Sequence, residues 1–355
     1  MPNDVFFMTQ AMQLAMRGSG FVRSNPLVGA VLVRDGRELA RAFHGRFGGS
    51  HAEAACLDQV ADATGATLYV NLEPCNHYGK TPPCCDRIIQ QGVSRVVVAN
   101  RDPNPLVNGG GLARLKAAGI DVTEGIMAKQ GRWLNRRYFF FMETGRPYVC
   151  LKLAATLDGK IADKTGTSKW ISSDRSRIKA HWLRGIHDAL LVGAGTFLTD
   201  WPRLTTRFPY KSLPDALPVV LDRRLRLEKR LGELAGKRPY LIYTTQVPSC
   251  RVPENVRVLS TQKKPFLAAV LGDLAGRGVS SVLVEGGGEV AYSLLAGRWV
   301  NEVLFVYAPK IIGGREATAM VSGAGLPLSS ALGVTDLRVY RFADDIAVLG
   351  MLEVC

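Results

Sequence analysis

The sequence predicts an α/β protein made of two domains. Short apolar segments typical of buried strands alternate with segments of helical periodicity. The alternation is interrupted once, in the aromatic segment 130–149, where Gly145, Arg146 and Pro147 form a plausible joint after a helix, and it then restarts. A chain of 355 residues has room for two domains of ordinary size. We therefore expect domains at residues 1–146 and 147–355.

The first half begins with an expected helix. Residues 3–17 carry apolar side chains at helical spacing, and Asn3 is a candidate N-cap. A strand at 27–33 is followed by Asp35-Gly36, a pair that favours a hairpin turn. The further expected elements are a helix from about 51, a strand at 66–74, a helix at 84–92, a strand at 93–100, and a helix with a short strand between 111 and 122.

The second half repeats the pattern with more strands. Its expected strands are 148–156, 189–193, 218–222, 240–245, 281–285 and 302–309, with two more between 336 and 352. Its expected helices start near 174 and cover 265–277 and 288–296. Strands that alternate with helices in this way are typical of a layered α/β domain.

Composition narrows the class of protein. No window approaches the ~18 uninterrupted apolar residues of a membrane span. The N-terminus carries Asp4 and lacks a basic segment before an apolar run, so it does not resemble a signal peptide, and we expect a cytoplasmic protein. The net charge of +14 would attract either nucleic acid or phosphorylated small molecules. Because the basic residues are spread along the chain, we favour phosphorylated metabolites.

A candidate metal centre lies in the first half. Three of the seven cysteines fall between residues 75 and 85, which in a cytosolic chain suggests metal binding or catalysis. His51, Cys75 and Cys84 make a good zinc set, with a fourth position open for water. Glu53 is spaced to lie beside that water and to transfer its proton. The spacing departs from the usual pattern of zinc nucleobase deaminases, since eight residues rather than two separate the cysteines.

The alternative for these residues is a structural zinc site with four protein ligands. Cys85 or His77 would then supply the fourth ligand. Cys85 is the direct neighbour of Cys84, and neighbours seldom bind the same ion. A structural site would also have no use for Glu53. We therefore favour a catalytic centre.

Several motifs together closely resemble the bifunctional deaminase–reductase of riboflavin biosynthesis. In the first half these are HAE, LEPCNHYGKTPPCC and RDPNP, and in the second half LKLAATLDGKIA, WISS, GAGTFLTDWPRLTTR and VEGGGEVAYSLL. The resemblance implies an N-terminal, cytidine-deaminase-like three-layer domain that removes an amine from diaminohydroxyphosphoribosylaminopyrimidine. It implies a C-terminal, dihydrofolate-reductase-like domain that uses NADPH to reduce the ribosyl group of 5-amino-6-(5-phosphoribosylamino)uracil to ribityl.

The resemblance also assigns residues in the deaminase half. His51, Cys75 and Cys84 match the zinc ligands, and Glu53 matches the proton donor. The residues that match the surroundings of the pyrimidine and its phosphate are Asn25, His44, His77, Lys80 and Asn104. Two of these have simpler explanations, since His44 resembles a half-buried loop histidine and Asn25 before Pro26 resembles a turn.

In the reductase half, a glycine turn at 286–288 follows a strand and opens a helix, an arrangement that lets backbone amides approach a pyrophosphate. The acidic ribose contact of a standard dinucleotide fold is not evident. By resemblance, NADPH contacts fall at Ala154, Trp170, Thr196, Asp200, Gly287, Gly288, Glu289, Val290, Ala291, Tyr292 and Ser293. By resemblance, substrate contacts fall at Ser168, Arg184, Leu204, Arg207 and Glu285, and Lys152 is a further candidate to face the reacting carbon.

Some of these assignments have alternatives. Arg184 and Arg207 suit phosphate binding. Without the family resemblance, each of these arginines would be interpreted as a solvated surface charge. The alternative to a cofactor contact at Trp170 is a side chain buried in the hydrophobic core. Arg223 and Arg224 follow the strand end at Asp222 and are candidates to meet the extra phosphate of the cofactor.

A rival hypothesis is a base deaminase that acts on tRNA or single-stranded DNA through a basic C-terminal domain. The charge permits it, but the glycine turn suits a dinucleotide and the sequence shows no RNA-binding motif. The resemblance implies small phosphorylated pyrimidines as partners, without nucleic acid or membrane. It further implies a homo-oligomer, either a dimer or a tetramer.

Overall fold

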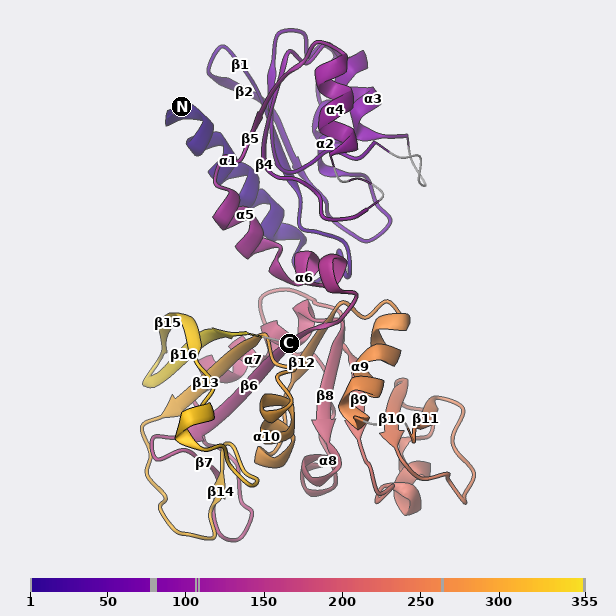
Figure 1. The fold of residues 1–355 in the computed structure, drawn as a ribbon, viewed down its shortest axis with the longest axis vertical. Helices are drawn as coiled ribbons and strands as arrows, with labels where there is room; N and C mark the ends of the chain where they lie inside the picture. The colour runs from indigo at the N-terminus through magenta and orange to yellow at the C-terminus, as the bar shows by residue number, and fades with distance from the viewer. Residues whose placement is uncertain (1, 77–81, 106, 108, 263–264, 354–355) are drawn as a thin grey trace. The chain divides into compact units, whose positions relative to one another are not determined.

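The computed structural model describes residues 2–76, 82–105, 107, 109–262 and 265–353. The chain forms two compact units, Met1–Gly145 (unit 1) and Arg146–Cys355 (unit 2), each of which is described by itself (Figure 1). The division falls one residue before the boundary that we expected. Gly145 ends helix α6 (Arg136–Thr144) with a φ of 66°, a left-handed conformation that glycine adopts without strain.

Unit 1 is built on a five-stranded sheet in the order β2-β1-β3-β4-β5. β1 pairs antiparallel with β2 and β3, while β3, β4 and β5 run parallel. Asp35 and Gly36 form the β1–β2 turn with φ of 52° and 75°, as a tight hairpin requires. The strands are β1 (Gly29–Arg34), β2 (Arg37–Phe43), β3 (Thr67–Leu72), β4 (Arg95–Asn100) and β5 (Asp121–Glu124).

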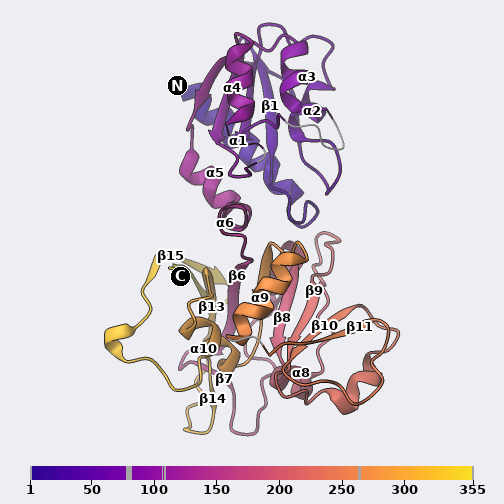
Figure 2. The same ribbon diagram turned by 45° about the vertical axis from the view of Figure 1, so that its right-hand side comes forward.

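Helices cover both faces of this sheet. Side chains alternate across it, so that Val31 and Val97 pack with α1 (Pro2–Ala15) and α5 (Ala128–Leu134), while Leu32 and Val96 face the other helices. Figure 2 shows α5 on one side of the sheet and α2 and α3 on the other. The helices of that second face are α2 (Ala52–Leu57), α3 (Cys84–Gln90) and α4 (Gly110–Ala117). The expected three-layer architecture is confirmed.

Unit 2 is built on a nine-stranded sheet in the order β11-β10-β9-β8-β12-β6-β13-β16-β15. The strands from β11 to β13 are parallel, and β16 and β15 add antiparallel at the edge. The strands are β6 (Tyr148–Thr156), β8 (Ala189–Gly193), β9 (Leu217–Leu221), β10 (Tyr240–Thr244), β11 (Val256–Ser260), β12 (Ser281–Val284), β13 (Glu302–Ala308), β15 (Val334–Phe342) and β16 (Asp345–Leu352). A small separate sheet pairs β7 (Lys160–Ala162) with β14 (Thr318–Ala319).

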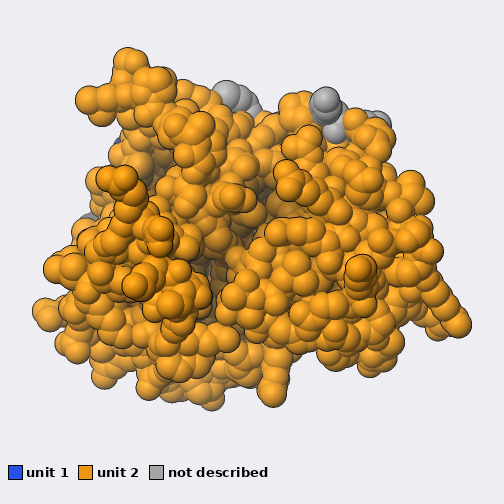
Figure 3. All heavy atoms as spheres, turned by 90° about the horizontal axis from the view of Figure 1, so that it is seen from below, with its two compact units in different colours: residues 1–145 blue, residues 146–355 orange. Residues whose placement is uncertain are grey.

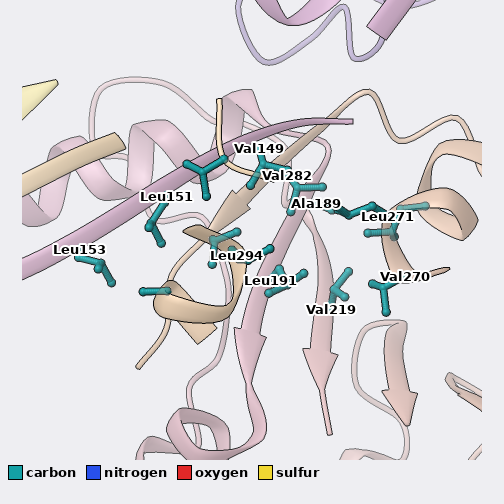
Figure 4. Packing of buried hydrophobic residues seen from close by; sticks show 14 of the residues in the cluster. Val149, Leu151, Leu153, Ala189, Leu191, Val219, Val270, Leu271, Val282 and Leu294 are labelled. Carbon is teal, nitrogen blue, oxygen red and sulfur yellow. The ribbon is translucent and has the colours of Figure 1, made fainter. Parts of the chain in front are cut away.

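Two helix layers enclose the large sheet. On one face, α9 (Phe266–Gly276) and α10 (Gly288–Ala296) bury Leu271 and Leu294 against strand residues such as Leu191 and Val282 (Figure 4). On the other face, α7 (Asp174–Ile186) and α8 (Ala194–Asp200) pack with Leu190 and Val220. Because the parallel strands end at one edge, the loops that follow β6, β8, β9 and β12 gather there.

The sequence analysis missed several short elements of unit 2. β7, α8, β11 and β14 were not expected, whereas β2 is the second strand that the predicted hairpin turn requires. The described residues also include 3₁₀ turns at Met16–Gly18, Glu228–Leu234 and Leu328–Ser330. Among the described residues, none of the helices combines the length and the apolar character needed to cross a bilayer.

Candidate active sites

The three predicted metal donors meet at one point of unit 1. His51 is the residue before α2, and Cys84 is the first residue of α3. Nδ1 of His51 lies 3.4 Å from Sγ of Cys75 and 3.4 Å from Sγ of Cys84, and the three donor atoms lie within 4.8 Å of one another. Cys75 lies in the loop after β3. The amide N–H of Cys84 donates to the Cys75 sulfur over 3.3 Å and orients it.

The charges of this cluster suit a divalent cation. Hydrogen bonds from the Cys84 thiol and from His51 lower the pKa of Cys75 below that of an ordinary thiol. The bond to Cys75 raises the pKa of His51 to about 9, against the effect of burial. Without an ion, the cluster therefore holds a thiolate beside a protonated imidazole, and a metal ion that binds there displaces the imidazole proton. One nitrogen with two sulfurs is a donor set that zinc prefers. The residues present fit a zinc ion.

Glu53 lies beside the donors without joining them. It occupies the first turn of α2, and only 3 % of its surface is exposed. Burial raises the pKa of Glu53 to about 7. A carboxyl group that titrates near neutrality can take up a proton and release it again, as a general acid–base catalyst must.

The structure argues against Cys85 as the fourth ligand of a structural zinc site. The thiol of Cys85 points away from the cluster, since it donates to the carbonyl oxygens of Pro74 at 3.5 Å and Gly111 at 3.6 Å. His77 lies outside the described residues. Within the part of the chain that the structure describes, the cluster has three protein donors, which leaves a tetrahedral ion with one open position.

A cavity of about 180 Å³ adjoins this cluster. Its wall includes three of the predicted pyrimidine contacts, Asn25, His44 and Asn104, together with His51 and Glu53. Nε2 of the His44 ring lies 3.2 Å from the side-chain nitrogen Nδ2 of Asn25. Nδ1 of the same ring lies 3.0 Å from the carbonyl oxygen of Ser50. Burial lowers the pKa of His44, so the ring is neutral and has a fixed orientation. The predicted contacts His77 and Lys80 lie outside the described residues.

The sequence analysis missed the residues that hold this cavity in shape. The buried carboxylate of Glu73 accepts hydrogen bonds from four backbone amides, those of Asp102, Gly109, Gly111 and Leu112. Asp102 in turn accepts from the Asn104 amide at 2.9 Å and from the Tyr138 hydroxyl at 2.8 Å. The sequence did contain a signal for this role, because Glu73 is an acidic residue at the end of an apolar strand, directly before Pro74.

In unit 2, a cavity of about 1000 Å³ opens where β6, β8 and β12 end. It brings together predicted residues from distant parts of the chain, and Figure 3 shows that this unit is hollowed on the face seen from below. The predicted cofactor contacts on its wall are Ala154, Trp170, Thr196, Asp200 and Gly287, and the predicted substrate contacts are Lys152, Ser168, Arg184, Leu204, Arg207 and Glu285. Trp170 is 64 % exposed, so the alternative of a core residue is wrong.

The two predicted phosphate-binding arginines differ in their surroundings. Arg184 is held by Glu285, with Nε 3.0 Å from Oε1 and Nη2 2.5 Å from Oε2, and its Nη1 donates to the Thr205 carbonyl oxygen. Burial opposes the charge of Glu285, but Arg184 keeps the pKa of that carboxyl below its ordinary value. Arg207 is more exposed, and its Nη1 donates to the Thr205 hydroxyl at 2.6 Å. Arg207 therefore has more hydrogen-bonding capacity left for a ligand than Arg184.

Lys152 and His181 complete the polar wall of this cavity. Burial lowers the pKa of Lys152, although Glu285 works against that effect. His181, which the sequence analysis missed, accepts the Arg207 amide N–H at its Nδ1 over 3.2 Å. Burial and the charges of Arg184 and Arg207 lower the pKa of His181 to about 4, so the ring is neutral and carries its proton on Nε2. The spacing of His181 and Arg184, three residues apart on α7, was the signal for a shared face.

Unit 2 has a second cavity, of about 950 Å³, which shares Gly195, Thr196 and Gly287 with the cavity of about 1000 Å³. Of the predicted cofactor segment, Gly287, Gly288, Glu289, Val290 and Ser293 line it. Ala291 is buried in the core, and the Tyr292 hydroxyl donates to the Gly325 carbonyl oxygen, so these two side chains do not line it. A side chain at Gly288 would collide with Ala319 and Ser322, which gives that glycine a packing reason besides the predicted approach of a phosphate.

Two protein-family models match separate parts of the chain. Residues 1–100 match the model of the cytidine and deoxycytidylate deaminase zinc-binding region. Residues 147–348 match the model of the RibD C-terminal domain.

Several relatives match most of the chain. A riboflavin biosynthesis protein RibD from Bacillus amyloliquefaciens is 41 % identical over 330 residues, which cover 91 % of this chain and 89 % of the relative. The RibD protein of Escherichia coli K12 is 38 % identical and covers 87 % of this chain and 89 % of the relative. Among solved structures, a diaminohydroxyphosphoribosylaminopyrimidine deaminase/5-amino-6-(5-phosphoribosylamino)uracil reductase from Thermotoga maritima is 37 % identical, covers 99 % of both chains and superposes with a TM-score of 0.88. A RibD structure from Acinetobacter baumannii gives 33 % identity over 99 % of both chains and a TM-score of 0.89.

Proposed function

The chain belongs to the RibD family of bifunctional deaminase–reductases of riboflavin biosynthesis, and on that premise we propose which substrates, metal, cofactor and residues serve its two reactions. The chain is a bifunctional enzyme, with a hydrolytic deaminase and a reductase on one polypeptide. Its deaminase region is of the zinc-binding kind, and a reductase of this family implies a nicotinamide cofactor. The finer assignments that follow are our proposals.

Unit 1 carries out the first reaction. We assign to residues 1–146 the hydrolytic deamination of diaminohydroxyphosphoribosylaminopyrimidine, with His51, Cys75 and Cys84 as the zinc ligands. Lewis-acid activation of water is the chemistry that zinc supplies when bound. Glu53 takes a proton from the attacking water and delivers it to the amino group, which leaves as ammonia. The convergence of the three donors beside a buried carboxyl group is the observation that carries this proposal.

The small cavity of unit 1 holds the pyrimidine ring. Asn25 and His44 stand next to each other on its wall and offer hydrogen bonds to polar ring edges. The Asp102–Tyr138 pair and the four amide bonds to Glu73 hold the loop that presents Asn104. For His77 and Lys80, the proposal rests on the family resemblance alone.

Unit 2 carries out the second reaction. We assign to residues 147–355 the reduction of 5-amino-6-(5-phosphoribosylamino)uracil. Hydride donation is the chemistry that NADPH supplies when bound. Conversion of ribosyl to ribityl opens the sugar ring, and the ring oxygen then needs a proton. Lys152, whose pKa burial lowers, is placed on the cavity wall to give that proton.

The charged side chains of the same cavity bind the rest of the substrate. Arg207 binds the phosphate, since its guanidinium group is the more available of the pair. Glu285, held by Arg184, accepts hydrogen bonds from sugar hydroxyls. His181 fixes the backbone at Arg207 and presents an N–H. Ser168 and Leu204 complete the substrate wall, and the remaining predicted residues contact the cofactor.

Compartment and assembly are also proposals. We place the enzyme in the cytoplasm, which agrees with the six described cysteines all being free thiols. We propose a homo-oligomer, because edge strand β15 exposes Leu337 and Val339 by 60 % and 70 %. Light scattering on the purified chain tests the assembly directly, and a monomer at micromolar concentration would contradict it.

The test of the deaminase assignment compares Glu53→Gln with the parent protein. The parent should contain one zinc ion per chain and release ammonia from the diamino substrate. Glu53→Gln should keep the zinc and lose ammonia release, because glutamine cannot carry the proton. NADPH oxidation with the pre-deaminated compound should stay at the parent rate, which shows that the variant is folded. Normal ammonia release by Glu53→Gln would remove the residue from the mechanism.

A further inference from the structure

The segment 201–208 of unit 2, here called the substrate segment, belongs to no helix or strand. It carries Leu204 and Arg207, two substrate contacts assigned to the cavity of about 1000 Å³. We propose that Arg238 and Asp215 are positioning residues, which hold this segment in the shape that binds the phosphorylated substrate. The inference deepens the proposed reductase function and rests on it.

Backbone groups of the substrate segment need partners from outside, because the segment is not part of a helix or a sheet. Four successive groups are each bound by a different side chain, namely the Leu204 carbonyl oxygen by Arg238 at 2.8 Å, the Thr205 carbonyl oxygen by Arg184 at 3.2 Å, the Thr206 amide by Asp215 at 2.5 Å and the Arg207 amide by His181 at 3.2 Å. Arg184 and His181 line the cavity. Arg238 and Asp215 are not among the described residues of its wall, so they form a second support that the proposed chemistry does not use.

Arg238 clasps both ends of the loop 204–216. Its Nη1 donates to the Leu204 carbonyl oxygen, and its Nη2 donates to the carbonyl oxygen of Ala216, directly before β9. The same Nη1 lies 3.3 Å from Oδ2 of Asp215, and only 18 % of the Arg238 side chain is exposed. The side chain of Asn255 donates to the Arg238 carbonyl oxygen at 3.1 Å and fixes the backbone from which the guanidinium group projects. A planar guanidinium fork can hold both carbonyls and the carboxylate at once, whereas a lysine ammonium is a single point of charge.

Leu204 needs this support because its backbone has an unfavourable conformation. Its φ of 51° is left-handed, and a bulky side chain seldom adopts that conformation unless its surroundings impose it. The side chain is only 3 % exposed and packs in the same core cluster as Ala216. Without the bond from Arg238, Leu204 can relax toward an ordinary conformation, and the peptide groups that follow it up to Arg207 would shift.

Asp215 connects the clasp to the middle of the substrate segment. Its Oδ1 accepts the Thr206 amide, and its Oδ2 pairs with Arg238. The loop between these two contacts is fixed against α7, since a side chain at Gly185 would come within 2.6 Å of Leu213. The helix that carries two of the four supporting side chains therefore also holds the loop in place.

The support should affect binding of the substrate more than binding of the cofactor. A ligand loses less affinity to ordering when the groups that bind it are already fixed, and Arg207 lies at the end of the supported segment. The assigned cofactor contacts on α10 and at the start of α8 do not depend on the clasp. Removal of Arg238 should therefore raise the KM for the reductase substrate and leave the Kd for NADPH nearly unchanged.

The experiment compares Arg238→Ala with the matched control Arg277→Ala. Arg277 also pairs with an aspartate, Asp273 at 2.6 Å, but it lies in unit 2 outside the described lining of both cavities. With the pre-deaminated substrate, Arg238→Ala should raise the KM by about 10-fold, the cost of losing a hydrogen bond to a charged group. Its kcat and its Kd for NADPH should stay within about a factor of three. The control should keep all three values, even if its melting temperature falls.

A purely structural role of Arg238 predicts a different pattern. Partial unfolding removes active molecules, which lowers the apparent kcat and leaves the KM unchanged. An Arg238→Ala protein with the parental KM would overturn the inference, whatever its melting temperature. If Arg238→Ala does not fold, Arg238→Lys and Asp215→Asn decide in its place. Each should raise the KM by about three-fold, because each keeps only part of the clasp, and the parental KM in both would overturn the inference.

A binding measurement without turnover separates this inference from the proposed reductase function. Calorimetry measures the affinity of the parent and of Arg238→Ala for the pre-deaminated compound in the absence of NADPH. The variant should bind it about 10-fold more weakly. Equal affinities would overturn the inference. A parent that binds the compound but does not reduce it with NADPH would instead contradict the proposed function.

Discussion

The three donors of unit 1 converge within 4.8 Å of one another, whereas the predicted contacts of unit 2 line a cavity of about 1000 Å³. In unit 1, two short segments at the starts of α2 and α3 supply most of the site. In unit 2, the wall is assembled from β6, α7, α8 and the turn after β12. A compact metal centre should fail completely when one donor is lost, while a dispersed wall should lose affinity in steps. The following predictions test that difference.

The largest effect is expected at the metal centre. Cys84→Ala should abolish zinc binding and ammonia release, because two donors hold the ion far more weakly than three. Cys85→Ala is the matched control, since this neighbouring thiol bonds to Pro74 and Gly111 instead. Zinc content by atomic absorption distinguishes the two. If Cys85→Ala also lost its zinc, the three-donor assignment would fail.

A graded effect is expected from Arg207. Arg207→Ala should raise the KM for the reductase substrate by about 10- to 100-fold, the usual cost of losing a hydrogen bond to a charged group. The Kd for NADPH should change little, because Arg207 is assigned to the substrate phosphate. Steady-state kinetics with the pre-deaminated compound measure both. A KM equal to that of the parent would remove Arg207 from the site and weaken the contrast between the two units.

A smaller effect is expected from the carboxylate that supports the deaminase cavity. Glu73→Gln should lower the free energy of unfolding of unit 1 by about 2 kcal/mol, because an amide cannot accept hydrogen bonds at both ends. Ammonia release should fall with it, since the Asn104 loop loses its anchor. Urea unfolding followed by tryptophan fluorescence reports the stability. A fully stable Glu73→Gln protein would show that the cavity holds its shape without this carboxylate.

The smallest effect concerns the opposite face of the same sheet. Arg95 donates to both carboxylate oxygens of Asp4 and holds the pKa of that carboxyl below its ordinary value. A lowered pKa contributes stability above the ordinary value, and that contribution is lost as the pH falls through the folded value. Asp4→Asn should therefore cost about 1 kcal/mol at pH 7 and progressively less below about pH 4.

The control for that prediction is Asp121→Asn. Asp121 also lies near Arg95, at 3.3 Å, but its side chain is 69 % exposed. Its removal should change the melting temperature much less than Asp4→Asn does at pH 7. Equal effects of the two substitutions would mean that burial does not set the strength of these ion pairs.

How much the sequence could predict also differs between the units. The donors of unit 1 stand in two short motifs, so their spacing already indicated zinc chemistry. The roles of Glu73 and Tyr138 depend on backbone amides and loops brought together by folding, and no local pattern shows such bonds. Whether Cys85 is a fourth ligand depended on the direction in which its thiol points, which only the structure could show.

For unit 2, periodicity predicted the long strands and helices but not the short elements. α8 was missed because its seven residues follow directly on β8, and the sequence analysis took them only as part of a motif. Equally, the resemblance indicated Arg184 and Arg207 together, but it could not show that Arg184 is occupied by Glu285. The position of His181 beside Arg207 follows from tertiary packing alone.

The central claim is that one chain carries two reactions in series. The most direct measurement follows NADPH consumption after the diamino phosphoribosyl-pyrimidine is added to the purified, zinc-loaded protein. The account predicts consumption that requires both the substrate and Glu53, because unit 2 acts on the deaminated product of unit 1. No consumption with either the diamino compound or its pre-deaminated form would contradict the assignment of the reductase.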